Sequence, residues 1–193
     1  MTKTSEPFSS RLGGETGISP YRVKVERRLS DLSNYFQDEK HVREMLSKGE
    51  DPKIYEIFEV PQPAVEGLLN FGCTIMHPGK IGSEYYFTRG HFHRKESTCE
   101  VYIGLEGEGF ILIQDRSGKV ISAKIKPSVL VYIPPNTAHR SVNTGTDRLL
   151  FFAVYPSDSD HDYETIENTG FAKIIVERDG RPVLEDNPKY RKS

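Results

Sequence analysis

Four side chains that can bind a transition metal stand at positions 91, 93, 100 and 139. His91 and His93 are two residues apart, so on a β-strand their imidazoles would point to the same face and could share one ion. A turn after His93 would return Glu100 to the same cavity, and His139 would add a third imidazole. Three neutral imidazoles and one carboxylate leave room for two more ligands. Such a set suits octahedral Fe(II), Mn(II), Ni(II) or Co(II) better than a structural zinc.

The segments that must position these ligands have the pattern of β-strands. Short apolar runs alternate with Gly, Pro, Asn and Asp, and no helical segment separates them, which predicts an all-β antiparallel sandwich or barrel. Ser117-Gly118 indicates a hairpin turn, and Pro134-Pro135 ends a strand because proline cannot donate to a ladder. The predicted strands are Ile54–Val60, Leu68–Met76, Tyr85–Thr88, Glu100–Leu105, Phe110–Gln114, Val120–Ile125, Val129–Ile133, Leu149–Tyr155 and Ala172–Val176.

The first fifty residues differ from the rest. Residues up to about Ser19 are rich in Ser, Thr and Gly, and the apolar spacing between Ser30 and Lys48 predicts one or two short helices. Asp38 is a suitable N-cap, and Gly49 stands where a helix would stop. We therefore predict an N-terminal extension with short helices over residues 1–50, a β-barrel over 51–177 and a tail over 178–193.

Composition narrows the range of partners. The 26 Lys and Arg residues nearly balance 28 Asp and Glu, so no basic surface is expected for nucleic acid or an anionic membrane. Two cysteines are too few for a disulfide framework, which favours reduced thiols in the cytoplasm. The N-terminus lacks the apolar core of a signal peptide, and no apolar run is long enough to cross a bilayer. A soluble cytoplasmic protein is expected.

The ligand motifs resemble a known superfamily. His-x-His with a downstream Glu and Gly, followed by Pro-x3-Ala-His-x3-Asn, resembles the two motifs of the cupins, which are jelly-roll β-barrels with a metal inside. Longer segments are similar to the cupin-type (archaeal-type) glucose-6-phosphate isomerases, over about residues 50–165. These segments are Glu84–His93, Glu100–Gly109, Pro134–Gly145, Ala153–Pro156 and His161–Tyr163.

The resemblance implies a cupin jelly-roll barrel, a homodimer and one divalent transition metal per subunit. Fe(II) is the preferred metal, with Mn(II), Ni(II) or Zn(II) as alternatives. The implied metal ligands are His91, His93, Glu100 and His139. The implied substrate-binding residues are Tyr55, Thr74, Thr88, Gly90, Tyr102, His161 and Tyr163. The sequence departs from the family at Asn136-Thr137, where an aromatic residue is common.

These residue types suit the interconversion of glucose 6-phosphate and fructose 6-phosphate. The reaction moves a hydrogen between C1 and C2, and a divalent ion can stabilise charge that develops on O1 and O2. Glu100 is the catalytic residue that could carry the proton through an enediolate, while a hydride shift is the competing mechanism. Hydroxyls of Thr74, Thr88 and Tyr163, with the backbone near Gly90, could hold the phosphate.

Other functions fit the same ligand set. A related sugar-phosphate isomerase, including one that also accepts mannose 6-phosphate, would share the metal and the fold. An iron dioxygenase would need an apolar pocket, whereas Thr74, Thr88, His161 and Tyr163 indicate a polar one. A cupin that binds a sugar or a metal without turnover is the non-enzymatic alternative.

Charged residues outside the ligand set receive structural interpretations. Arg140 follows a predicted ligand, so strand alternation turns its side chain away from the metal, and we interpret it as an ion-pair partner. The charged run Glu177–Arg181 is interpreted as a solvated turn, and Asn187–Ser193 as a frayed tail.

Overall fold

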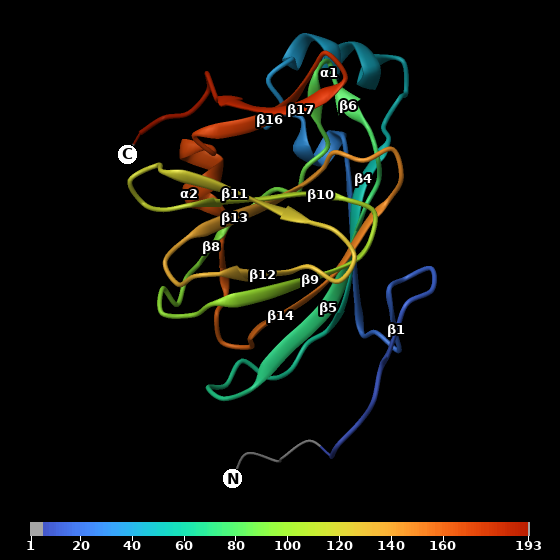
Figure 1. The fold of residues 1–193 in the computed structure, drawn as a ribbon, viewed down its shortest axis with the longest axis vertical. Coiled ribbons are helices and arrows are strands. Elements are labelled where there is room, and N and C mark those ends of the chain that lie inside the picture. Colours follow the sequence, from blue (N-terminus) through green and yellow to red (C-terminus); the bar gives the residue numbers. More distant parts are fainter. Residues whose placement is uncertain (1–5, 193) are drawn as a thin grey trace.

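The computed structural model describes residues 6–192, and it confirms the predicted all-β antiparallel architecture. All strand pairs in this range are antiparallel. The two main sheets wrap around a common interior (Figure 1). The larger sheet has the order β12 (Leu130–Ile133), β9 (Glu100–Glu106), β14 (Leu149–Pro156), β5 (Leu69–Met76), β4 (Lys53–Val60) and β3 (Val23–Arg28). The smaller has the order β11 (Val120–Ile125), β10 (Gly109–Gln114) and β13 (Ala138–Asn143).

Shorter strands complete the barrel and its surroundings. A four-stranded sheet has the order β17 (Arg181–Asp186), β16 (Lys173–Arg178), β7 (Glu84–Tyr85) and β6 (Lys80–Ile81). Two small ribbons pair β1 (Arg11–Leu12) with β2 (Ile18–Ser19) and β15 (His161–Asp162) with β8 (Phe92–His93). The helical elements are η1 (Ser30–Leu32), α1 (Glu39–Ser47) and α2 (Tyr163–Thr169). Within residues 6–192 no helix is long and apolar enough to span a membrane.

Strand alternation decides which side chains enter the interior. Along β9, Glu100 and Tyr102 are buried while Val101 and Ile103 are only half-buried. Ile111 of β10 and Phe151 of β14 fill the space between the sheets and are almost completely buried. The barrel wall therefore turns Glu100 and Tyr102 of β9 inward.

The N-terminal helix forms as its sequence predicts. The side chain of Asp38 accepts a hydrogen bond from the backbone N–H of His41, which caps α1. Gly49 follows the helix with a φ of 78°, a left-handed conformation that glycine adopts without steric cost. Val42 is buried on the inner face of the helix.

Of the strands longer than two residues, the sequence does not predict β3, β13 and β17, and charge explains the absence of β3 and β17. In β3, Val23 and Val25 alternate with Lys24 and Glu26, but two arginines follow and no side chain of the strand is fully buried. Lys24 and Glu26 form ion pairs with Glu56 and Lys53 of the neighbouring strand. Strand β17 contains a proline and several charges and pairs with β16 at an edge. Cross-strand ion pairs and main-chain pairing, rather than an apolar face, hold both strands.

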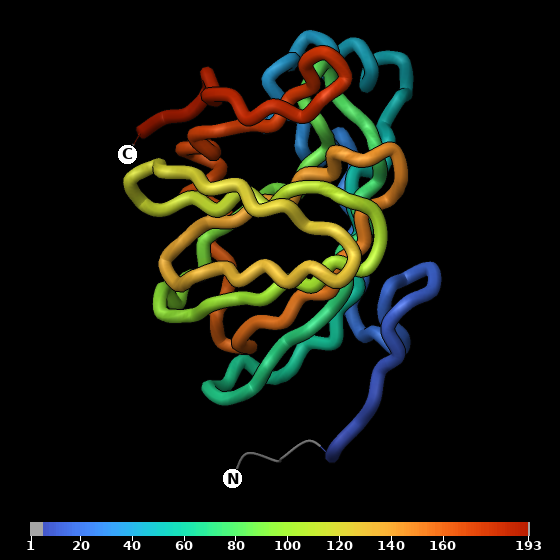
Figure 2. The backbone as a smooth tube through the Cα atoms, viewed as in Figure 1, coloured from blue at the N-terminus to red at the C-terminus, as the bar shows by residue number. Residues whose placement is uncertain are grey.

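The prediction of a frayed C-terminal tail is wrong for its described part, residues 187–192. Lys189 donates to the carbonyl of Phe36 and to Glu39 at 2.6 Å each. The side chain of Asn187 donates to the carbonyl of Phe171, and the N–H of Arg191 donates to Thr169. Figure 2 shows this red segment beside the blue chain around α1. Contacts between distant parts of the chain hold the tail, so no local pattern indicates them. Ser193 lies outside the described residues.

Candidate metal centre

The four predicted metal ligands converge inside the barrel. One ligand atom from each of His91, His93, Glu100 and His139 lies within 4.8 Å of the other three. The backbones of His91 and His139 face each other and exchange two hydrogen bonds of 3.3 and 3.0 Å. Glu100 begins β9, and the turn after His93 brings it back as the sequence predicts. Three separate segments of the barrel wall thus direct their side chains to one point.

Thr98 orients the ring of His93. The Thr98 hydroxyl donates to the carbonyl of Lys95 at 2.7 Å, so it is left to accept from the Nδ1–H of His93 at 2.9 Å. This hydrogen bond places the proton on Nδ1 and the lone pair on Nε2. Nε2 lies 3.3 Å from Glu100 Oε2, on the side where the ligand atoms gather.

Several ring nitrogens at this point lack a hydrogen-bond partner. The buried atoms His91 Nε2, His139 Nδ1 and His139 Nε2 have none among residues 6–192. His139 Nε2 lies 2.9 Å from Glu100 Oε2, but without hydrogen-bond geometry. Unpartnered buried nitrogens are costly, and a divalent cation would bind the lone pairs of the ligand nitrogens. The residues present therefore fit a metal ion of the type that prefers imidazole and carboxylate.

The protonation states also suit metal binding. Burial, followed by the neighbouring His139, places the pKa of His91 well below its ordinary value. Burial alone would raise the pKa of Glu100, but His139 and His93 together lower it to about 2. At neutral pH His91 is therefore neutral and Glu100 is ionised, which are the forms that ligate metals.

A small cavity of about 50 Å³ opens beside the ligands. His91 and His139 form part of its wall. Six of the seven predicted substrate-binding residues also line it, namely Tyr55, Thr74, Thr88, Gly90, Tyr102 and Tyr163. His161, His93 and Glu100 do not line it. The ring of His161 is nevertheless 4.2 Å from that of His91, centroid to centroid, and its strand pairs with the strand of His93.

Gly90 is required by the shape of this wall. Its φ is 76°, and a Cβ at this position would lie 2.6 Å from the ring of Phe171 and 3.0 Å from the carbonyl of His139. Both the backbone conformation and the crowding exclude a side chain. The chain can therefore turn closely past His139 and place Thr88 and His91 on the same cavity.

Helix α2 places Tyr163 at the cavity. The sequence analysis did not predict this helix, although Asp162 caps it by accepting from the N–H and the hydroxyl of Thr165. Burial, followed by Tyr55 and Glu59, raises the pKa of Tyr163 to about 12, so its hydroxyl stays protonated. Burial lowers the pKa of His161 to about 4, so this imidazole is neutral at pH 7.

Arg89 is a cavity residue that the sequence analysis missed. Its guanidinium lies 4.8 Å from the centre of the Tyr163 ring and bonds to the Tyr35 hydroxyl at 2.5 Å and to Glu167 at 2.6 Å. The available signal was its place between Thr88 and Gly90, two predicted substrate residues. Strand alternation does not predict the direction of the Arg89 side chain, because residues 88–91 do not form a regular strand.

Comparison with known proteins agrees with this arrangement. Residues 26–191 match the family described as glucose-6-phosphate isomerase. The chain is 45% identical to a glucose-6-phosphate isomerase of Thermococcus litoralis, over 98% of this chain and 99% of the relative. It is 45% identical to that of Pyrococcus furiosus, over 97% and 98%. It is 36% identical to a putative glucose-6-phosphate isomerase 1 of Rhizobium meliloti, over 99% and 91%. The chain therefore belongs to the glucose-6-phosphate isomerase family.

Proposed function

We propose that this protein is a metal-dependent isomerase that interconverts glucose 6-phosphate and fructose 6-phosphate, a step of glycolysis and gluconeogenesis. The observation that carries the proposal is the convergence of three imidazoles and one carboxylate beside a hydroxyl-lined cavity. Membership of the isomerase family supports the choice of reaction. A polar cavity wall also favours a sugar over the apolar substrate that a dioxygenase would need.

His91, His93, Glu100 and His139 are the residues that would hold the metal, with Fe(II) as the proposed ion and Mn(II), Ni(II) or Zn(II) as alternatives. The bound ion would act as a Lewis acid toward the oxygens on C1 and C2. The hydrogen bond from His93 to Thr98 supports this role, because it fixes the tautomer that leaves Nε2 available.

The phosphate group of the substrate is proposed to bind the hydroxyl groups of the cavity wall. Thr74, Thr88 and Tyr163 offer hydroxyls, and Tyr163 stays protonated and can donate. Arg89, held by Tyr35 and Glu167, adds N–H donors at the same wall without a lysine cluster. Binding energy collected from the phosphate would hold the reacting carbons in place.

The cavity is smaller than typical small-molecule sites, which span roughly 300–1,000 Å³. At about 50 Å³ it admits a sugar phosphate only if side chains at its wall move. Tyr163 and Arg89 are the candidates, because both line the cavity and the Arg89 guanidinium lies over the Tyr163 ring.

Glu100 is proposed as the group that carries the proton between C1 and C2. It is ionised, and its contacts with His93 and His139 use only Oε2, so Oε1 makes no hydrogen bond within residues 6–192. A substrate labelled with deuterium at C2 tests this step against a hydride shift. Release of label to water supports proton transfer by Glu100, whereas complete retention of label at C1 contradicts it.

The assay of the whole proposal uses the full chain with glucose 6-phosphate and measures fructose 6-phosphate. Turnover is expected to disappear on chelation and to return with Fe(II), Mn(II), Ni(II) or Zn(II), in amounts that depend on the ion. Mannose 6-phosphate serves as the competing substrate. Absence of turnover with a measured, fully occupied metal site would leave a sugar-binding cupin as the function.

A cytoplasmic homodimer is part of the proposal, as the family resemblance and the cysteine content predict. Sedimentation of the metal-loaded protein measures the oligomeric state directly. A single species of 44 kDa is expected from the chain mass of 22.0 kDa.

A further inference from the structure

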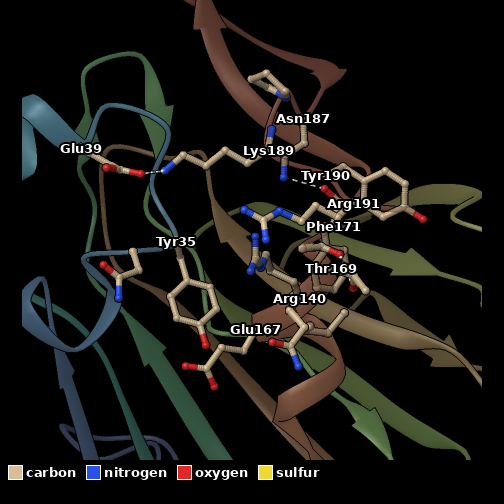
Figure 3. Close-up of a pocket in the computed structure, with 15 residues that line it drawn as sticks. Tyr35, Glu39, Arg140, Glu167, Thr169, Phe171, Asn187, Lys189, Tyr190 and Arg191 are labelled. Carbon is tan, nitrogen blue, oxygen red and sulfur yellow. Dashed lines mark hydrogen bonds and ion pairs between the residues drawn. The ribbon is translucent and has the colours of Figure 1, made fainter. Parts of the chain in front are cut away.

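A second and larger pocket lies on the far side of helix α2. Its volume is about 500 Å³, and its wall comes from the segments around Tyr35, the end of α2 and residues 187–191 (Figure 3). None of the four proposed metal ligands and none of the seven predicted substrate residues lines it. It is therefore separate from the metal centre, although the two share helix α2 and Arg140 directly follows His139.

Arg140 enters this pocket from the barrel wall. The side chain is only 4% exposed, and its guanidinium lies between the rings of Phe87 and Phe171, 4.4 and 4.5 Å from their centres. Its one hydrogen bond within residues 6–192 runs from Nη2 to the carbonyl of Arg89 at 2.9 Å, and its buried Nε has no partner. A guanidinium has five N–H donors, so most of them are unused.

The prediction that Arg140 is an ion-pair partner is wrong. No carboxylate among residues 6–192 lies within 4.0 Å of its nitrogens. The buried Glu84 acts on Arg140 only from beyond this distance. A buried, permanently charged group without a counter-ion is unfavourable unless a ligand supplies the opposite charge.

The charges of the remaining wall leave a positive excess. Lys189 is neutralised by Glu39 at 2.6 Å, and Glu167 is neutralised by Arg89 at 2.6 Å. Arg191 lines the same pocket (Figure 3) and makes no ion pair and no side-chain hydrogen bond with residues 6–192. Two guanidinium groups, those of Arg140 and Arg191, thus line one pocket, and neither forms an ion pair with residues 6–192.

We propose that this pocket binds a small phosphate monoester, with Arg140 and Arg191 as its anion-binding residues. A phosphate monoester carries a charge between −1.5 and −2 at pH 7, which matches two uncompensated guanidinium groups. The planar guanidinium fork binds phosphate oxygens in pairs. The rings of Tyr35 and Tyr190 are in position to contact the organic part of the ligand. The proposal rests on this pocket alone and does not depend on the isomerase reaction.

The test is a titration of the full-length, zinc-loaded protein with phenyl phosphate, followed by the NMR signals of the backbone amides. Shifts are expected around residues 34–39, 167–171 and 187–191. Phenyl sulfate has the same shape with one negative charge, and it is expected to bind several-fold more weakly. Shifts confined to residues 55, 74, 88–90 and 163 would assign all phosphate binding to the first cavity and overturn the proposal.

Three variants identify the residues responsible. Arg191→Ala replaces an exposed side chain, so the fold is retained, and the affinity is expected to fall about tenfold. Glu39→Gln frees the charge of Lys189 and is expected to raise the affinity about threefold. Arg181→Ala, which removes an equal charge from the far end of β17, serves as the control and leaves the affinity unchanged. Equal losses in the Arg181 and Arg191 variants would reduce the effect to net charge and contradict a built site.

Discussion

The metal centre and the second pocket are two places where buried polar groups lack a hydrogen-bond partner within residues 6–192. The unpartnered groups are acceptors at the metal centre and donors in the second pocket. At the metal centre, ring nitrogens of His91 and His139 present lone pairs, and a cation would satisfy them. In the second pocket, Arg140 presents unused donors, and an anion would satisfy them. The sign of the unsatisfied group therefore indicates the class of ligand.

Helix α2 separates the two places. Its first residue, Tyr163, lines the small cavity beside the metal ligands, and its last residues line the second pocket. Phe171 contacts Arg140 on one side, and its ring crowds Gly90 on the other. The two sites thus share a wall, and substitutions in it show whether they are independent.

Glu100→Gln is expected to have the largest effect, because it removes the ionised carboxylate at which the ligand contacts converge. General acid–base catalysis contributes roughly 10²–10⁴-fold, so kcat should fall by about a thousandfold even when added metal restores occupancy. The measurement is kcat with metal content determined in parallel. Glu106→Gln, on the same strand but paired with Arg148 near the surface, is the matched control. Activity near that of the unmodified protein would remove Glu100 from catalysis.

Gly90→Ala tests how tightly the wall shared by the two sites is packed, and the free energy of unfolding is the readout. The positive φ and the approach of Phe171 and His139 together should lower the free energy of unfolding by about 4 kcal/mol. Gly180→Ala has nearly the same φ of 73° but open space around its Cβ, so only about 1 kcal/mol is expected there. Urea denaturation of the metal-free proteins measures both. Equal losses would show that crowding at Gly90 is relieved by movement of Phe171.

The pH dependence of stability that Glu84 causes shows whether Arg140 lacks a counter-charge. Burial raises the pKa of Glu84 to about 7, and the charge of Arg140 opposes this only in part. The folded state therefore holds a proton that the unfolded chain releases near pH 4.5. The contribution of Glu84 to the free energy of unfolding is fully present below pH 4.5. It is lost as the pH rises to 7, by up to roughly 3 kcal/mol.

The variant for this test is Glu84→Gln, which keeps an oxygen for the N–H of Gln37 and removes the titration. Its stability should change less between pH 5 and 8 than that of the unmodified protein. Glu108→Gln, an exposed site, is the control. An unchanged pH dependence would mean that Glu84 is ionised in the folded state and neutralises Arg140, which would weaken the contrast between the two sites.

The same contrast explains what could be predicted from the sequence. The two-residue spacing places His91 and His93 together, the turn after His93 brings in Glu100, and the cupin-like motif adds His139. The second pocket joins Tyr35, Arg140 and Arg191, whose proximity depends on contacts such as that of Lys189 with Phe36. No local period reports such contacts. Helix α2 was missed because only its cap at Asp162, and no apolar stripe, distinguishes it from a loop.

Tyr163→Phe is expected to have the smallest effect. It distinguishes substrate binding at the start of α2 from phosphate binding at its end. Loss of one hydrogen bond to a charged phosphate costs about 1.5 kcal/mol, so KM for glucose 6-phosphate should rise about tenfold while kcat stays nearly constant. Tyr132→Phe, an exposed tyrosine on β12, is the control. Because Tyr163 does not line the second pocket, phenyl phosphate should bind there with unchanged affinity in the variant. A parallel loss at both sites would mean that α2 couples them, and the two pockets would then act as one binding system.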